Sequence, residues 1–368
     1  MWIGLGEAQS KCQHLAGVAL KPETAKELLT IFLAKGVHAT TAIEGNTLSE
    51  EQVRKRIENS NLDVVPPSQR YLQTEVDNVI ALSSKIANHV ADIGASPISV
   101  DDICSYNAQL LNDMELEDHV EPGKLRKITV GVNDYRGPEA RFCEPLMAKL
   151  CEWLNGATFI PPDPNDKVVY GILKAVTAHL YLAWIHGFGD GNGRTARAVE
   201  VRFLMEAGVP MTAAHLLSNH YNQTRSEYYR QLSRASKSGG DVAPFLLYSV
   251  RGFVDQLRAQ LDIVRLYQFN MAWENYIYDR FGKNKSPAHK RQIKLLLALS
   301  DWDDWVEKSQ LRRLNVEIAE EYAVKTSKTL SRDLNSLAKE RFVLQRGNRH
   351  LANKGIIRAF LPKQNAES

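Results

Sequence analysis

The chain has 368 residues, of which 44% are hydrophobic and 24% charged, a balance that excludes an intrinsically disordered protein. At about 150 residues per domain, this length predicts two or three domains. We find no run of 18 apolar residues and no basic, then apolar, N-terminal segment, so we expect no membrane span and no secretory signal. Four cysteines without a C-x-x-C pair predict reduced thiols and a cytoplasmic protein.

The net charge of +3 is unevenly distributed along the chain. Residues 281–368 carry 18 Lys and Arg against 10 Asp and Glu, a net +8, whereas the first 280 residues carry 28 against 33, a net −5. A basic segment of this size predicts a separate domain that meets a polyanion. Such a charge is also common on a domain that is merely well solvated.

Helical periodicity dominates the first 280 residues. The segments with apolar residues at helical spacing are 23–43, a short helix capped by Ser49, 68–92, 99–113, 166–185, 194–207, 223–237 and 242–279. Residues 166–185 are apolar nearly all round, which predicts a central buried helix. Residues 125–143 instead alternate and then contain Asn-Asp and Gly-Pro turn signals, which predict a β-hairpin.

A glycine-rich segment, HGFGDGNGRTAR at residues 186–197, separates two of these helices. Its glycines allow backbone N–H groups to turn inward as an anion-binding nest, at the positive end of the next helix. Arg194 and Arg197 can both face one polyphosphate, Asp190 is a hard oxygen ligand of the kind Mg²⁺ takes, and His186 is a candidate general base. The dinucleotide, Walker A and EF-hand motifs all fail here. The alternative is a flexible interhelical loop with a surface histidine.

This segment resembles the signature of the Fic family, H-x-F-x-[D/E]-G-N-G-R-x-x-R, at every fixed position. Members of that family are helical proteins that mostly transfer AMP from ATP to a protein hydroxyl. The resemblance implies roles for eight residues: His186 as catalytic base, Phe188 as loop anchor, Asp190 as Mg²⁺ ligand, Gly191, Asn192 and Gly193 as the phosphate cradle, and Arg194 and Arg197 as ligands of the remaining phosphates.

A second motif lies upstream, TTAIEGN at residues 40–46. It resembles the [S/T]-x-x-x-E-[G/N] inhibitory motif of Fic proteins, with Thr40 and Glu44 at the fixed positions. Glu44 is therefore expected to bind Arg197 in place of a phosphate, because a carboxylate can accept a bidentate bond from arginine. The alternative is an ordinary helix end, with Gly45 as its cap and Glu44 as a solvated charge.

Two further segments match the family by position. The hairpin at 127–143 matches the flap, which pairs with the target protein by β-augmentation; its alternative is a structural hairpin that covers the core. Tyr228 and Tyr229 match the segment that closes the adenine pocket, and are expected to bind the nucleotide by stacking. Their alternative is packing in the core.

The basic C-terminal region reads as helices at 316–323 and 327–339, a strand and turn from Phe342, and a returning strand or helix at 356–360. This pattern resembles a winged helix-turn-helix domain, which would bind DNA through 316–360 or serve as a protein-interaction module. The predicted domains are an N-terminal helical region with the inhibitory motif (1–98), a Fic catalytic core (99–255), a linking helix (256–284) and the winged helix (285–368).

The predicted fold is therefore mainly α, a Fic-type helical bundle with a β-hairpin flap and a C-terminal winged helix. The predicted function is that of an auto-inhibited protein adenylyltransferase, which moves AMP from Mg-ATP to a hydroxyl of a protein, including itself, and releases pyrophosphate. Removal of AMP, transfer of another nucleotide or phosphate, and a DNA-binding regulator with a nucleotide-sensing core stay open as alternatives. The target and a homodimer are also left open.

Overall fold

The computed structural model describes residues 1–59, 66–129, 131–132, 135–282 and 286–358. Its contacts divide the chain into two compact units, Met1–Asp262 and Ile263–Ser368. Helix α12 (Ala243–Phe281) continues across this division, which falls inside the predicted linking helix at 256–284.

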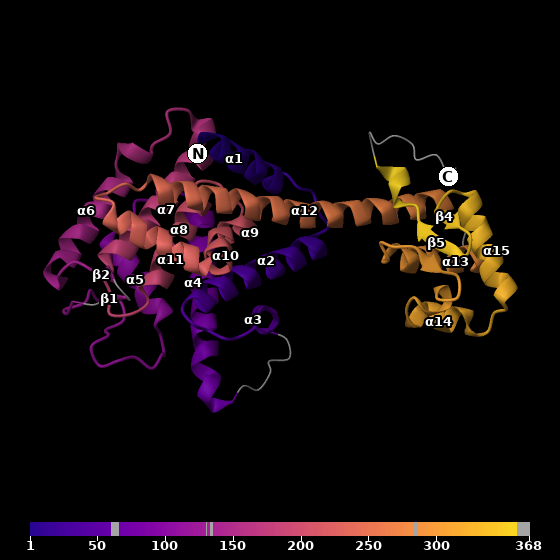
Figure 1. The fold of residues 1–368 in the computed structure, drawn as a ribbon, viewed down its shortest axis with the longest axis horizontal. Coiled ribbons are helices and arrows are strands. Elements are labelled where there is room, and N and C mark those ends of the chain that lie inside the picture. Colours follow the sequence, from indigo (N-terminus) through magenta and orange to yellow (C-terminus); the bar gives the residue numbers. More distant parts are fainter. Residues whose placement is uncertain (60–65, 130, 133–134, 283–285, 359–368) are drawn as a thin grey trace. The chain divides into compact units, whose positions relative to one another are not determined.

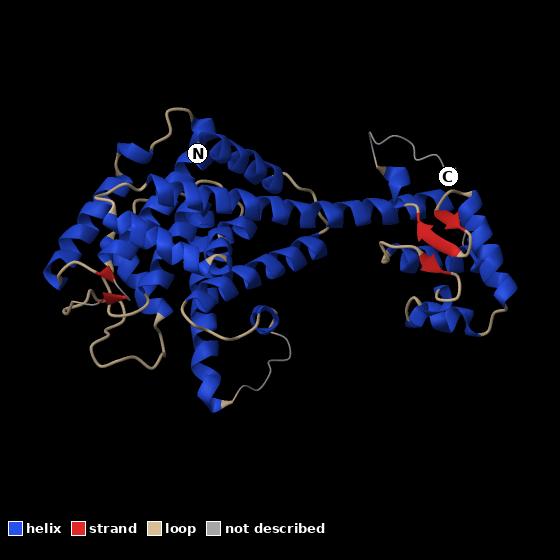
Figure 2. Cartoon of the chain, viewed as in Figure 1, coloured by secondary structure: helices blue, strands red, loops and turns tan. Residues whose placement is uncertain are grey.

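The first unit is mainly helical, as predicted (Figures 1 and 2). Besides the start of α12, its α-helices are α1 (Trp2–Ala16), α2 (Pro22–Ile43), α3 (Glu50–Ile57), α4 (Arg70–Ile93), α5 (Val100–Leu110), α6 (Cys143–Asn155), α7 (Lys167–Ile185), α8 (Asn192–Glu206), α9 (Met211–Ala214), α10 (Leu216–Gln223) and α11 (Arg225–Lys237). Helices α1, α6, α9 and α10 were not predicted. In α1, two glycines lower the helix propensity of the segment, and packing against α7 compensates for it.

Side-chain caps explain why several helices begin where the sequence predicts. Ser49 caps α3, because its hydroxyl accepts from the Gln52 N–H at 3.2 Å while Gln52 Oε1 accepts from the Ser49 N–H at 2.9 Å. Ser99 and Asp102 form the same reciprocal pair at the start of α5. Both caps satisfy N–H groups that the first helical turn leaves unpaired.

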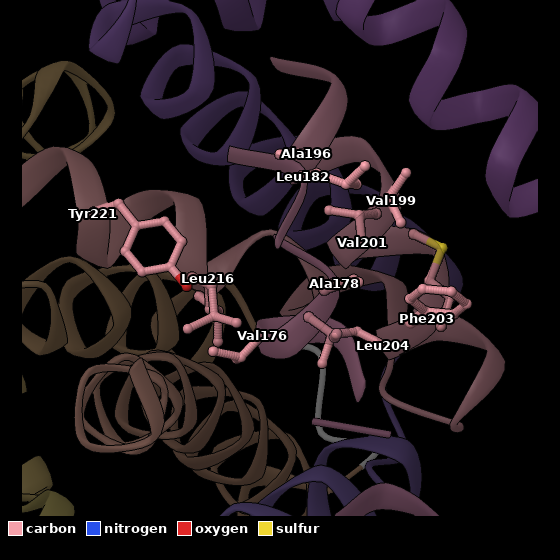
Figure 3. Close-up of a cluster of buried hydrophobic side chains, with 14 of the residues drawn as sticks. Val176, Ala178, Leu182, Ala196, Val199, Val201, Phe203, Leu204, Leu216 and Tyr221 are labelled. Atoms are coloured by element: carbon pink, nitrogen blue, oxygen red, sulfur yellow. The ribbon is translucent and has the colours of Figure 1, made fainter. Parts of the chain in front are cut away.

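The core of this unit is built around α7 and α8, which pack against each other along their length. Figure 3 shows the buried apolar side chains that they contribute together with α10, among them Val176, Leu182, Val199, Phe203 and Leu216. The segment Pro164–Ile185 is long and apolar enough to cross a membrane, but 61% of its most apolar window is buried inside the unit. The central position expected for residues 166–185 is confirmed.

The predicted hairpin is short. Strand β1 (Gly131–Val132) pairs antiparallel with β2 (Tyr135–Arg136), in the register Gly131–Arg136 and Val132–Tyr135. Val130 and the turn at 133–134 lie outside the described residues. Ala140–Phe142 of the predicted 127–143 segment form a 3₁₀ helix, and Cys143 already begins α6.

The second unit combines helices with a small antiparallel sheet. Its elements after α12 are α13 (Pro287–Ser300), β3 (Val306–Glu307), α14 (Val316–Ala323), α15 (Ser327–Lys339), β4 (Val343–Arg346) and β5 (Arg349–Ala352), and the strand order is β3-β5-β4. The returning strand or helix expected at 356–360 is not a strand at its described residues, 356–358, because the chain already reverses at Gly347, whose φ is +58°, and pairs back as β5. Residues 354–357 form a 3₁₀ turn instead. The winged-helix assignment stays a prediction.

Candidate active site

His186 is the residue directly after the central helix α7. Its backbone is left-handed, with φ 47° and ψ 52°, and its N–H donates to the Leu182 carbonyl at 3.0 Å. Burial lowers the pKa of His186; a hydrogen bond to the Ala183 backbone acts in the opposite direction, and the positive charge of Arg126 lowers the pKa further. The imidazole is therefore neutral near pH 7, the form that a general base needs.

The glycine-rich loop that follows is anchored through Phe188 and Asn192. Phe188 is 2% exposed, its N–H donates to Asn192 Oδ1 and its carbonyl accepts from Asn192 Nδ2, both at 2.9 Å. The Asn192 side chain thus fastens the loop, which leaves only its backbone N–H for the phosphate cradle. Gly191 has a φ of +74°, a conformation that favours glycine, directly before α8.

Glu44 lies against the first turn of α8. A Cβ added to Gly193 would stand 2.3 Å from Glu44 Oε1, so only a glycine allows this approach. The carboxylate accepts a hydrogen bond from Arg197 Nη2 at 2.5 Å. It is therefore placed at the positive end of a helix, where a phosphate would also bind.

Arg197 is 2% exposed and is held by the end of α2. Its Nε donates to the Thr40 hydroxyl at 2.6 Å and its Nη2 to the Thr40 carbonyl at 3.0 Å. The expected bidentate pair is corrected here: Glu44 contacts Arg197 through one oxygen, because Thr40 takes the Nε proton. Burial opposes ionisation of Glu44, but the charge and hydrogen bond of Arg197 outweigh it and lower the pKa of Glu44.

Asp190 and Arg194 meet a carboxylate that the sequence did not indicate. Arg194 Nη1 donates to Glu75 Oε1 at 2.8 Å, and its Nη2 lies 3.3 Å from Asp190 Oδ1. Glu75 is buried, and Asn46, the last residue of the upstream motif, donates to its other oxygen at 2.8 Å. Burial raises the pKa of Glu75 despite the Arg194 charge. Both signature arginines are thus paired with carboxylates.

The two tyrosines have different environments. Tyr228 is 3% exposed, its hydroxyl lies 2.9 Å from His179 Nε2 and its ring is stacked on Tyr221 at 4.7 Å between centroids. This arrangement corresponds to the core alternative, and we withdraw Tyr228 from the nucleotide-binding set. Tyr229 is 36% exposed and donates to the Ile43 carbonyl at 3.4 Å, so its ring lies beside the end of α2.

Sequence reasoning missed three buried polar residues that organise the site. Besides Glu75, these are Asn107, whose Nδ2 donates to the Asp190 carbonyl at 2.9 Å, and Arg126, which donates to the His186 carbonyl at 2.7 Å. A signal existed for the two helical ones: Glu75 and Asn107 stand on the apolar faces of α4 and α5, where an unpaired polar group would be costly.

The donor set also bears on Mg²⁺. Asp190 is 47% exposed at its side chain; its Oδ1 accepts from the Gly191 N–H at 2.5 Å, whereas Oδ2 has only a long contact with Arg194, at 3.4 Å, so Oδ2 is available to a cation. Among the residues that the structure describes, no group of three His, Cys, Asp or Glu side chains gathers as a metal site. These residues fit a cation carried mainly by phosphates with one protein carboxylate, which is the usual arrangement for Mg²⁺ in nucleotide sites.

Comparison with known proteins finds a family match within the first unit. Residues 97–204 match the model of the Fic/DOC family. Protein adenylyltransferase fic-1 of Caenorhabditis briggsae is 32% identical over 212 residues, which are 58% of this chain and 38% of that protein. Protein adenylyltransferase Fic of Nematostella vectensis is 30% identical over 217 residues, 58% of this chain and 45% of that protein.

Solved structures agree with this match. Fic-1 of Caenorhabditis elegans (residues 134–508) superposes with a TM-score of 0.56 at 26% identity over 72% of both chains. A Fic family protein from Desulfovibrio desulfuricans superposes with a TM-score of 0.56 over 95% of both chains, and at 19% identity it shows the fold alone. This chain is therefore similar to Fic/DOC proteins through residues 97–204, which contain the signature at 186–197. The chain spans 38–45% of the length of these curated relatives.

Proposed function

We propose that this chain is an auto-inhibited protein adenylyltransferase, which transfers AMP from ATP to a hydroxyl group of a protein. The observation that carries the proposal is the position of Glu44, on Arg197 and over Gly193, at the helix terminus next to His186. The names of the Fic relatives support the type of reaction.

In the proposed reaction the target hydroxyl attacks the α-phosphorus of ATP. A bond forms between the hydroxyl oxygen and this phosphorus, the bond to the bridging oxygen breaks, and pyrophosphate leaves with the electron pair. His186 accepts the hydroxyl proton through its free ring nitrogen. The N–H groups at the start of α8 and the two signature arginines stabilise the negative charge that develops on the phosphates. Asp190 would hold Mg²⁺, which supplies charge neutralisation at the phosphates when bound.

Inhibition follows from the same contacts. The Glu44 carboxylate accepts a hydrogen bond from the Arg197 guanidinium and lies against the backbone of Gly193. It therefore competes with the terminal phosphate of ATP for both groups. Arg194 is likewise paired with Glu75. ATP then binds weakly, or with its α-phosphate turned away from the attacking group.

Incubation of the Glu44→Gly chain with α-³²P-labelled ATP and Mg²⁺ tests the activity, and mass spectrometry identifies the transferred group. We expect label on the chain itself and a mass increase of one AMP. Label from α- but not γ-labelled ATP distinguishes AMP from phosphate transfer. Loss of AMP from a previously modified chain would instead favour the removal reaction. No label on any protein would contradict the proposal.

Replacing Arg197 with alanine in the Glu44→Gly background should weaken ATP binding by about 1.5–3 kcal/mol, the range for a hydrogen bond to a charged group. Calorimetry measures the affinity, and thermal unfolding reports whether this buried site still folds. Arg251→Ala is the matched control, because Arg251 is an exposed arginine of α12. Equal affinity in both variants would show that Arg197 does not hold a phosphate.

The basic second unit supports an additional function, the binding of a nucleic-acid backbone. The exposed side chains of α15 are Ser327, Lys328, Arg332, Asn335 and Lys339, which include three cations and no acid. Its one acidic residue, Asp333, is buried and accepts from Arg291 at 2.7 Å. This helix face therefore carries only positive charge, as phosphate contacts require.

Fluorescence anisotropy of the full chain with a mixed-sequence DNA duplex tests that function. We expect binding that weakens with salt, and a salt slope that falls by about 2 when Lys328 and Arg332 are both changed to Gln, about 0.9 per lost phosphate contact. Lys85→Gln with Lys124→Gln removes the same charge from the first unit as a control. Equal slopes for the two double variants would exclude α15 as the binding surface.

A further inference from the structure

Arg126 lies directly before the hairpin and is 5% exposed. Its guanidinium donates to three backbone carbonyls: Nε to His186 at 2.7 Å, Nη1 to Ile128 at 2.7 Å and Nη2 to Pro138 at 2.5 Å. Its own N–H donates to the Gly187 carbonyl at 2.9 Å. The acceptors are in the signature loop, in the segment before β1 and in the segment after β2. One side chain therefore joins three separate stretches of chain.

The loop needs such a contact because His186 is left-handed. A residue with a side chain seldom adopts φ 47°, and it keeps this conformation only where its surroundings hold it. The His186 N–H is held by Leu182 and its carbonyl by Arg126, so both peptide groups that flank the residue are fixed. A second tie runs from the Tyr135 hydroxyl of β2 to the Trp184 carbonyl in the last turn of α7.

The segment that follows β2 also approaches His186 closely. A Cβ added to Gly137 would stand 3.0 Å from Arg126 Nη2 and 3.5 Å from the His186 Cβ. The segment that follows β2 is therefore in contact with both the arginine and the imidazole-bearing residue. A shift of the hairpin would be transmitted to His186, and a shift of His186 to the hairpin.

We propose that Arg126 is a positioning residue for the transfer reaction, which fixes the His186 imidazole relative to the hairpin that presents the target hydroxyl. This inference rests on the proposed function. A base must lie within hydrogen-bond reach of the proton it removes, and a displacement of about 1 Å can cost about 10²-fold in rate. Arg126 meets this need by holding the base and the target-binding segment through one rigid, planar group.

Two substitutions separate geometry from charge. Arg126→Lys keeps a positive charge but cannot donate to three carbonyls in a plane, whereas Arg126→Gln removes the charge as well. The charged groups that act on His186 are Arg126, which disfavours its protonated form, and Glu44 and Asp190, which favour it. Lys124→Gln is the control, because Lys124 is an exposed neighbour that pairs with Glu121.

The experiment measures kcat, KM for ATP and thermal unfolding in the Glu44→Gly background, and the pKa of His186 by NMR of ¹³C-labelled histidine in the full chain. We expect kcat to fall about 10–100-fold in both Arg126 variants, with KM for ATP within about twofold of the parent. The pKa of His186 should rise in Arg126→Gln only. Lys124→Gln should match the parent in every measurement.

Unchanged kcat in a folded Arg126→Lys or Arg126→Gln chain would overturn the inference. If neither variant folds, Gly137→Ala replaces them, since its added Cβ would stand 3.0 Å from Arg126 Nη2 and displace that group from the Pro138 carbonyl, and it should lower kcat in the same way. If the Glu44→Gly parent transfers no AMP, the proposed function fails. The NMR titration then decides alone, because an unchanged His186 pKa in Arg126→Gln would overturn the placement of Arg126.

Discussion

Glu44→Gly should transfer AMP about 5–150 times faster than the unaltered chain at subsaturating ATP, the range that corresponds to a coupling of about 1–3 kcal/mol. The reason is competition for one position. Glu44 Oε1 lies 2.5 Å from Arg197 Nη2 and in contact with Gly193, so the carboxylate and a terminal phosphate cannot both occupy this corner. Initial rates of label incorporation over a range of ATP concentrations measure the gain.

Two control variants make that result specific. Glu44→Gln keeps the size of the side chain but removes its charge, and should give a smaller gain, because an amide is a weaker ligand of Arg197. Glu50→Gly removes an exposed carboxylate from the first turn of α3 and should leave the rate unchanged. A wild-type chain as fast as Glu44→Gly would end the auto-inhibition proposal, while the transferase proposal would stand.

His186→Ala in the Glu44→Gly background should lower the rate of transfer by about 10²–10⁴-fold, the usual contribution of a general base. ATP affinity should change little, because the groups proposed to bind phosphate lie on α8 and on the loop that precedes it, not on the imidazole. Calorimetry and the labelling assay on the same preparation separate these two quantities. Full activity in this double variant would refute both the base assignment and the mechanism.

The pH dependence of the Glu44→Gly chain provides a second measure of the same residue. A base acts in its deprotonated form, so kcat should rise with pH through the pKa of His186 and level off above it. Burial and the Arg126 charge lower that pKa below its ordinary value of 6.5, so the plateau should already be reached near neutral pH. A rate that still rises steeply above pH 7 would assign the base to another group.

The sequence alone determined those features that depend on local chemistry and spacing. Twelve consecutive residues carry the signature, and their close spacing means that any fold places His186, Asp190 and Arg194 near one another. Helix starts at Ser49 and Ser99 were predictable for a similar reason, because a cap needs only a partner three residues away. The buried character of α7 followed from its apolar composition on every face.

Only the tertiary structure decided which distant residues complete the site. Glu75 lies 119 positions before Arg194 and Arg126 lies 60 before His186, and no local pattern encodes these pairs. Tyr228 is a similar case. Its position in a helix is compatible with a ring that stacks on a base and with a core residue, and only its contacts with His179 and Tyr221 show that it belongs to the core. The physical reason is that a buried charge or hydroxyl is stable only when it has a hydrogen-bonding partner. That partner comes from the helix that packs next to it in the tertiary structure.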